Sequence, residues 1–357
     1  MAPSQASRKT ELQSLIELTR TSSSLITHYL STISSPSTST NSTSNITDPP
    51  NPLHVLKDAA LLLKSHTTKL GLLLLNPPFT PTAISSILRA MTTTCLPALL
   101  SAVELAPSNI WGRLLRTEVD VRVTAVLRAV EACLADVRAT ATAEEGDAAA
   151  RPKKDTLAAT GVVWEACDAL VELEELDVGG LALRKAKAYQ ALLRDALEEL
   201  KEWREESTAD DGDEDDEEED EDKDEDEDYG LGSAGKLPRD RPELLLALDD
   251  ALVKIKRVDF LYTALAKRRV ATFTKDKARI RDHVRTMDEV LDEFKTMSET
   301  TDELASAFYE LDEEGIEEHK NTLVEEARKT IKLVRVSWDG TEDEFTAWSS
   351  KWLEVMK

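Results

Sequence analysis

Apolar residues recur at intervals of three and four along most of the chain, which is the spacing of an amphipathic helix. The longest such stripe covers residues 109–140, where charged side chains fill the remaining positions. No segment alternates apolar and polar residues for long enough to indicate a strand. The pattern therefore predicts an all-α chain with helices over residues 10–33, 53–75, 81–105, 109–140, 157–176, 181–206, 243–271, 274–297, 300–311, 316–337 and 345–356.

Proline and glycine predict where two of these helices bend or end. Pro97 lies inside the 81–105 helix, where a missing N–H and a bulky ring favour a kink or a division. Gly179 and Gly180 follow an apolar stripe, and glycine adopts a positive φ at no steric cost. We therefore expect a turn over residues 177–180, where both glycines are free to take positive φ.

Two helices carry patterns that predict where they pack. Residues 53–75 are apolar almost all round the helix, which is typical of a helix at the centre of a bundle. Trp348 and Trp352 lie one turn apart in the last predicted helix. Side chains at this spacing share one face of a helix, so these two are expected to anchor it to the rest of its bundle.

Two segments of biased composition divide the chain. Residues 31–52 are rich in Ser and Thr and end in a proline cluster, which predicts a disordered loop. Residues 210–228 are all Asp or Glu except Gly212 and Lys223, and a run without apolar side chains cannot bury a core. We therefore predict two antiparallel helical bundles, over residues 1–206 and 243–357, separated by a disordered acidic linker over 207–242.

The net charge of −25 restricts the classes of partner. Binding to nucleic acid needs clustered Lys and Arg to neutralise phosphates, so no direct contact with nucleic acid is expected. An acidic chain is better matched to basic protein surfaces. Charged and polar residues interrupt the apolar cluster at 61–75, so no membrane span is expected, and residues 1–10 lack the apolar core of a signal peptide. The oligomeric state is left open.

Three cysteines, Cys95, Cys133 and Cys167, lie far apart and within apolar helical patterns. An odd number of widely spaced cysteines does not form a disulfide framework. We interpret them as buried structural thiols of a protein in a reducing compartment, the cytoplasm or the nucleus.

Sequence motifs for catalysis, cofactors and metals are not found. The chain has no glycine-rich phosphate loop, zinc-binding HExxH, nucleophile elbow or CxxC. None of its five histidines follows a Glu by three residues, as a di-iron helix bundle requires. The expectation is a protein that is not an enzyme and holds no cofactor or metal.

Basic residues are concentrated in one segment, 267–281. Acidic flanks argue against a DNA-binding basic region there, and we interpret the segment as a solvated helix face. Its first three residues, 267–269, end a predicted helix. They are interpreted as complementing the helix dipole and aiding solubility, with nuclear import or a partner contact as the alternative.

Residues 160–170 read Thr-Gly-Val-Val-Trp-Glu-Ala-Cys-Asp-Ala-Leu. This segment resembles the Gly-x-x-Trp-x-x-Cys-Asp helix of the cyclin-D1-binding protein 1 family, also called Grap2 and cyclin-D-interacting protein. The matching residues are Gly161, Trp164, Cys167 and Asp168. We interpret them as packing and helix-surface positions, with Trp164 as a core anchor rather than an exposed hot spot.

The resemblance implies helical bundles similar to those of talin rods and α-catenin. It also implies binding to D-type cyclins and to helix-loop-helix transcription factors, with a negative effect on cell-cycle progression and transcription, in both nucleus and cytoplasm. The family lacks a DNA-binding basic region, which agrees with the composition of this chain.

Three functions are compatible with these patterns. The first is a non-enzymatic regulatory protein that captures an amphipathic helix of a partner in a helical groove. The second is an acidic, histone-chaperone-like protein that shields basic clients with its acidic run. The third is a cytoskeletal adaptor, supported by fold type alone, which does not settle function.

Overall fold

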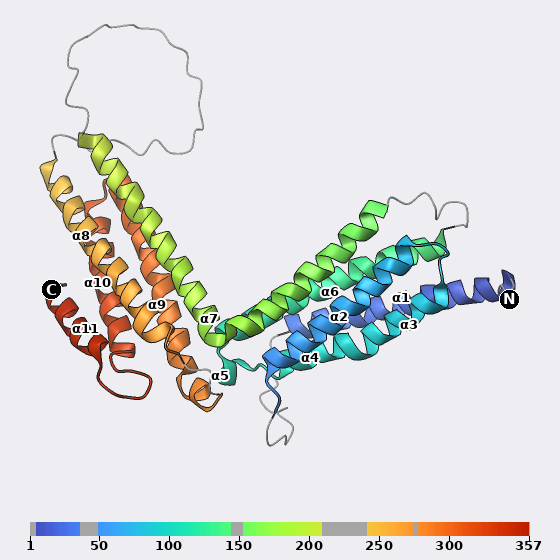
Figure 1. Ribbon diagram of the computed structural model, residues 1–357. Coiled ribbons are helices and arrows are strands. Elements are labelled where there is room, and N and C mark those ends of the chain that lie inside the picture. Colours follow the sequence, from blue (N-terminus) through green and yellow to red (C-terminus); the bar gives the residue numbers. More distant parts are fainter. Residues whose placement is uncertain (1–4, 36–48, 144–152, 209–240, 274–276, 357) are drawn as a thin grey trace, which may run out of the picture. The chain divides into compact units, whose positions relative to one another are not determined.

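The computed structural model describes residues 5–35, 49–143, 153–208, 241–273 and 277–356. Within these ranges the regular elements are all helices, with no strand, so the predicted all-α class is confirmed. The predicted acidic linker (207–242) and Ser/Thr-rich loop (31–52) fall largely outside the described residues. The chain divides into two units, Met1–Leu181 and Ala182–Lys357 (Figure 1).

The first unit is built from long helices that lie side by side. α1 packs against α3 and α6, and α2 packs against α3 and α4. Their inward faces supply a core of Leu, Val, Ile and Ala side chains. The elements are α1 (Gln5–Ser34), α2 (Pro52–Leu75), α3 (Pro81–Ala90), α4 (Leu96–Glu104), α5 (Ser108–Trp111), α6 (Arg113–Thr142) and the first part of α7 (Lys153–Thr208).

A π-helical turn, η1 (Met91–Cys95), joins α3 to α4. The Leu96 N–H bonds to the Met91 carbonyl, five residues back. Pro97 follows, and its ring and missing N–H disfavour the i−4 spacing at this point. The division predicted at Pro97 is therefore confirmed, and it takes the form of a widened turn within one continuous helical rod.

This rod, Pro81–Glu104, is also the one described helix whose length and composition would allow it to cross a membrane. Apolar residues of this rod pack into the core of the helical bundle. Ile84, Leu88, Leu96 and Leu99 are fully buried in the first unit. The helix-bundle core accounts for this composition.

The break in α7 lies at Asp177, not at the glycines. Asp177 has φ 53° and ψ −168°, a backbone region used mainly by glycine and costing other residues about 1–3 kcal/mol. Its Oδ1 accepts hydrogen bonds from the backbone N–H groups of Gly179 (2.7 Å) and Gly180 (3.2 Å). The predicted turn at 177–180 is confirmed, but the residue with positive φ is the aspartate, which bends the chain and caps the helix that follows.

The described residues of the second unit form the rest of α7 and four further α-helices. α10 packs against α8 and α9, and α8 continues into a second π-helical turn. A single helix spans the predicted break at 298–299, where Ser298 Oγ donates to the Lys295 carbonyl and stays within the helical ladder. The elements are α8 (Pro242–Leu265), η3 (Ala266–Val270), α9 (Lys277–Tyr309), α10 (Glu313–Leu333) and α11 (Glu344–Val355).

The second part of α7 packs in the second unit, so the predicted boundary after residue 206 is wrong. Gln190 Nε2 donates to Asp259 Oδ1 of α8 at 2.7 Å, and Arg194 Nε donates to the same carboxylate at 2.7 Å. The Trp203 ring lies against Phe308 and Tyr309. The acidic run had suggested the boundary, but the apolar face of this helix finds its partners beyond that run.

Candidate functional site

The family-like segment lies on the part of α7 that packs beside α2. A Cβ added to Gly71 of α2 would lie 3.0 Å from Oγ1 of the buried Thr160. A contact at this distance is tighter than nine in ten real Cβ contacts, so Thr160 would have to shift by a few tenths of an ångström. Gly71 therefore allows the two helices to pack against each other at this level.

Two ion pairs extend this contact along the helices. Lys64 Nζ lies 2.6 Å from Asp168 Oδ1, and Lys57 Nζ lies 3.0 Å from Glu174 Oε2. The Glu174 carboxylate accepts a hydrogen bond from Lys57 and raises the pKa of that lysine. Positions ascending along α2 meet positions descending along α7, so the two helices run antiparallel. We call this contact the α2–α7 seam.

The four residues of the predicted motif occupy different positions at the seam. Cys167 is fully buried, whereas Asp168 is exposed and pairs with Lys64. Trp164 is half-buried, and its indole N–H is buried without an acceptor among the described residues. A Cβ at Gly161 would meet nothing within 4 Å. The motif therefore combines packing and surface positions, and Trp164 is less buried than a core anchor.

The three cysteines are buried and unpaired. Burial raises the pKa of the Cys167 thiol to about 12 and those of Cys95 and Cys133 to about 11. A thiol with a raised pKa carries almost no thiolate at neutral pH and is a poor nucleophile or metal ligand. The burial that the sequence predicted for these thiols is confirmed.

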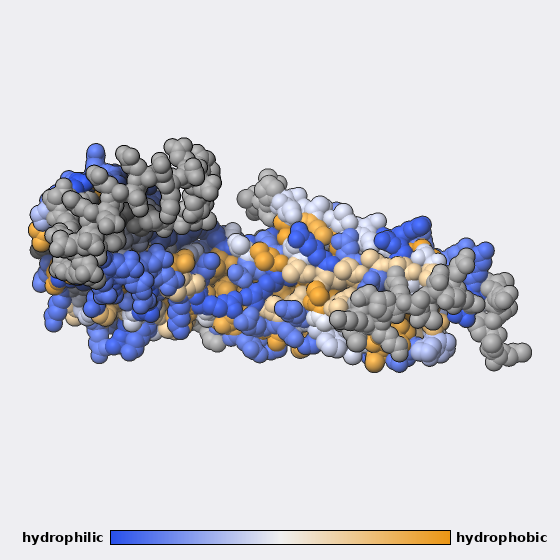
Figure 2. Space-filling view, turned by 90° about the horizontal axis from the view of Figure 1, so that it is seen from above, coloured by the Kyte–Doolittle hydropathy of each residue, from blue (hydrophilic) through white to orange (hydrophobic). Residues whose placement is uncertain are grey.

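The outer side of α2 presents large apolar side chains to solvent. Leu61, Leu62 and Leu72 are 48%, 41% and 55% exposed. Leu61 and Leu72 are eleven residues apart, which is close to three full helical turns, so they share one side of the helix. The prediction that this helix lies at the bundle centre is wrong, because its apolar residues include this outward-facing group. Figure 2 shows that apolar residues reach the surface of this unit among polar ones.

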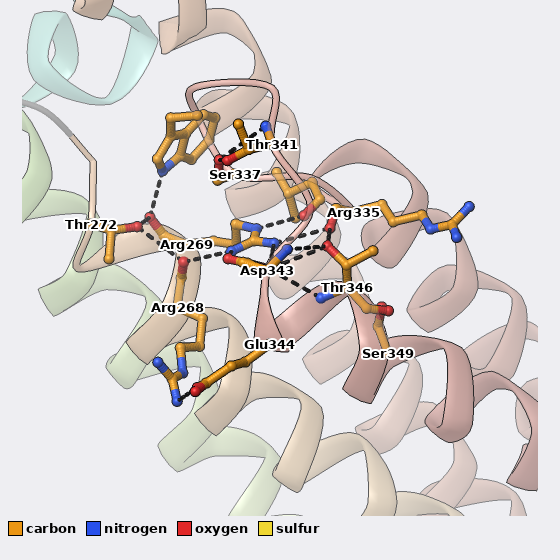
Figure 3. Close-up of polar contacts among 12 residues, drawn as sticks. Arg268, Arg269, Thr272, Arg335, Ser337, Thr341, Asp343, Glu344, Thr346 and Ser349 are labelled. Atoms are coloured by element: carbon orange, nitrogen blue, oxygen red, sulfur yellow. Dashed lines mark hydrogen bonds and ion pairs between the residues drawn. The ribbon is translucent and has the colours of Figure 1, made fainter.

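The second unit contains a dense polar cluster around Arg269 (Figure 3). The side chain is 1% exposed, so it is not part of the solvated face that the sequence suggested. Its five N–H groups all donate: Nε to the Val334 carbonyl, Nη1 to the Arg268 carbonyl and Asp343, and Nη2 to the Arg335 carbonyl and Asp343. A buried guanidinium is stable only when its donors are satisfied in this way.

Asp343 connects this arginine to α11. Its carboxylate receives Arg269 at 2.7 and 2.9 Å and accepts from the backbone N–H of Thr346 at 3.1 Å, and the Asp343 N–H bonds to Thr346 Oγ1. This reciprocal pair is a capping box at the start of α11. The hydrogen bonds from Arg269 hold the pKa of Asp343 well below its usual range.

Two further contacts attach α11 to the bundle, one beside Arg269 and one toward the other end of α11. Arg268 pairs with Glu344 at 2.5 Å. Trp352 is buried and donates its indole N–H to the Arg257 carbonyl at 3.0 Å, which confirms the predicted anchoring of the last helix. Trp348 is only half-buried. The cluster therefore holds α11 on the bundle and is a structural joint.

Metal-binding side chains do not gather in the described part of the chain, where no group of three or more His, Cys, Asp or Glu is placed to hold an ion. Within the first unit, the α2–α7 seam and the exposed leucines beside it are surface features of another kind. We take this region as the candidate site for a protein partner.

Comparisons with known proteins bear on this same region. Residues 55–206 match a family described as Grap2 and cyclin-D-interacting, N-terminal. The match begins in α2, includes the seam and ends near the end of α7. An uncharacterized protein of Schizosaccharomyces pombe is 27% identical over 307 residues, which are 85% of this chain and 83% of that protein. Residues 55–206 are thus similar to the Grap2 and cyclin-D-interacting family, as the resemblance at 160–170 predicted.

Proposed function

We propose that this chain is a non-enzymatic regulatory protein that binds a protein partner through the outer side of α2. The observation that carries the proposal is the exposure of Leu61 and Leu72 on one side of a helix within the family-matched residues. Exposed apolar side chains that recur on one helix face are a common docking surface for an amphipathic partner helix.

The edges of this surface are suited to a specific contact. Lys64 and Asp168 lie on either side of the seam and pair with each other while remaining accessible, with side chains 35% and 59% exposed. A rim of exposed charges around apolar residues fixes the register of a partner more than it adds affinity. The exposed leucines of α2 thus form an apolar strip, and the charged residues of the α2–α7 seam form its polar border.

The partner class follows from the family. The family is described as cyclin-D-interacting, so a D-type cyclin is the first partner to test, and a helix-loop-helix transcription factor is the second. We propose that binding restrains cell-cycle progression and transcription and that the protein acts in both nucleus and cytoplasm. Imaging of the tagged chain in its own cells tests the location.

The binding experiment compares exposed leucines changed in the same way. We expect the wild-type chain to bind a purified D-type cyclin saturably in calorimetry or biolayer interferometry. Leu61→Asp with Leu72→Asp is expected to weaken binding at least tenfold, since a carboxylate in an apolar contact costs more than 1.4 kcal/mol. Leu192→Asp is the matched control, because Leu192 is 50% exposed but lies on the second part of α7.

Two results would overturn the proposal. One is the absence of saturable binding to either partner class. The other is equal weakening by Leu192→Asp and by the α2 variants, which would show that added charge alone reduces binding. Unchanged far-ultraviolet circular dichroism and thermal unfolding must accompany the variants.

A second candidate function is supported by the acidic run at 210–228. Seventeen carboxylates in nineteen residues can compete with DNA for a basic protein surface. Deletion of this run distinguishes the two functions. Loss of binding to histones with retention of the cyclin contact would identify a separate shielding activity.

A further inference from the structure

α8 has a second apolar stripe on the side that faces solvent. Leu246, Val253 and Phe260 are spaced by seven residues and are 71%, 47% and 55% exposed. Seven residues make nearly two helical turns, so the three side chains line one face over four turns. The opposite face of α8 carries Leu248, Ile255 and Tyr262, which are fully buried in the unit. α8 is therefore apolar on two opposite sides, of which only one is covered.

The charges beside this stripe are distributed unevenly along the helix. Asp249 and Asp250 lie between Leu246 and Val253, whereas Lys256 and Arg257 lie between Val253 and Phe260. The N-terminal half of the stripe is thus bordered by carboxylates and the C-terminal half by cations. If the helix is turned end over end about Val253, the acidic half takes the place of the basic half.

This distribution is complementary to itself in one orientation. If two copies of α8 lie antiparallel with the two Val253 side chains opposite each other, Leu246 faces Phe260 of the second copy. Asp249 then faces Lys256 on one side of the stripe, and Asp250 faces Arg257 on the other, twice each by symmetry. In a parallel arrangement, each aspartate would face the same aspartate of the other chain, and each cation would face the same cation. Like charges across an interface repel each other.

The charges retain enough exposure to take part. The side chains of Asp249 and Asp250 are 43% and 46% exposed, although they pair with Arg204 and with Lys254 and Lys320. Lys256 is exposed. The carboxylates can therefore accept a further cation from solvent while they keep their intramolecular pairs.

From this complementarity we propose that two copies of the chain associate through α8, antiparallel about Val253. Specific interfaces of standard size bury about 800 Å² per partner, and a stripe of three apolar residues is smaller, so the association is weak and depends on concentration. This contact lies in the second unit and is independent of the partner site proposed on α2.

The first test measures the mass of the full chain by sedimentation equilibrium from low to high micromolar concentration. The wild-type average mass is expected to rise toward that of a dimer. Val253→Asp places two carboxylates opposite each other at the symmetry axis and is expected to abolish the rise. Val121→Asp is the control, because Val121 is an exposed valine of the first unit and its substitution should leave the rise unchanged.

The second test separates a charge contact from a general loss of structure. Asp249→Lys and Lys256→Glu are each expected to abolish self-association, since each variant sets like charges opposite each other. An equimolar mixture of the two variants is expected to associate, because position 249 of either chain then faces an opposite charge at position 256 of the other. A change that only disturbed folding would not be rescued by mixing.

The proposal fails if the wild-type chain stays monomeric over this range, or if Val253→Asp and Val121→Asp behave alike. It also fails if the mixture of charge variants remains monomeric while wild type associates. In that last case the contact lies elsewhere on the surface.

Discussion

Arg269 shows how one residue type in a run can have several roles. Lys267, Arg268 and Arg269 are adjacent and basic, yet only Arg269 is buried with every donor satisfied. The partners that distinguish it, including Asp343, lie more than sixty residues further along the chain. Nothing in the local sequence marks which of the three faces the core, so its role could not be predicted.

Loss of this buried pair should destabilise the second unit strongly. Arg269→Met removes the guanidinium and leaves the Asp343 carboxylate without its main partner, which typically costs about 3–5 kcal/mol. Arg268→Met is the control, since its pair with Glu344 is 46% and 79% exposed and such surface pairs contribute about 0–1 kcal/mol. Urea unfolding, followed by circular dichroism, gives both values. A similar small loss for the two variants would contradict the structural role of Arg269.

Among the elements, the positions of long amphipathic helices were predictable because their apolar period is strong. The positions of the breaks between these helices were harder to predict. The chain turns at Asp177 although two glycines follow it, and it stays helical through Ser298 where a break was expected. Side-chain hydrogen bonds to the backbone decide these points, and the apolar period contains no information about them.

The two glycines of the α2–α7 seam should respond differently to the same substitution. In a helix interior, Ala is favoured over Gly by about 1 kcal/mol. Gly161→Ala meets open space and is expected to gain most of this stability. Gly71→Ala sets a methyl group against Thr160 and is expected to be neutral or destabilising. Thermal unfolding of both variants is the measurement, and an equal gain would show that the seam is looser than described.

The candidate site was partly predictable. The motif at 160–170 directed attention to the α7 side of the seam, and the structure adds α2, whose Leu61 and Leu72 had been assigned to a bundle core. A helix with apolar residues all round is ambiguous in sequence, because a central position and an exposed docking face give the same composition.

At the scale of the whole molecule, the acidic run gave a misleading boundary. Composition shows which residues cannot form a core, but it does not show which core the preceding helix completes. Trp203 lies against Phe308 and Tyr309 on the far side of that run in the sequence. The division after Leu181 follows those contacts.

This division predicts which fragments fold. Residues 182–357 are expected to unfold cooperatively as one unit. Residues 243–357 lack the helix that carries the buried Leu193, Leu200 and Trp203, and are expected to be less stable by at least about 5 kcal/mol, since each large core side chain removed costs several kcal/mol. Calorimetry of both fragments decides the matter. Equal stability would restore the boundary at residue 206.

The π-helical turn at Ala266–Val270 has an evolutionary consequence. Such a turn accommodates one residue more than an α-helical turn of the same span. A descendant or ancestor that lost one residue here would present Arg269 rotated by about 100° around the helix, away from Asp343. A single-residue gap at this place in an alignment would therefore be linked to the loss or replacement of the acidic residue at 343, and the two changes should be inherited together.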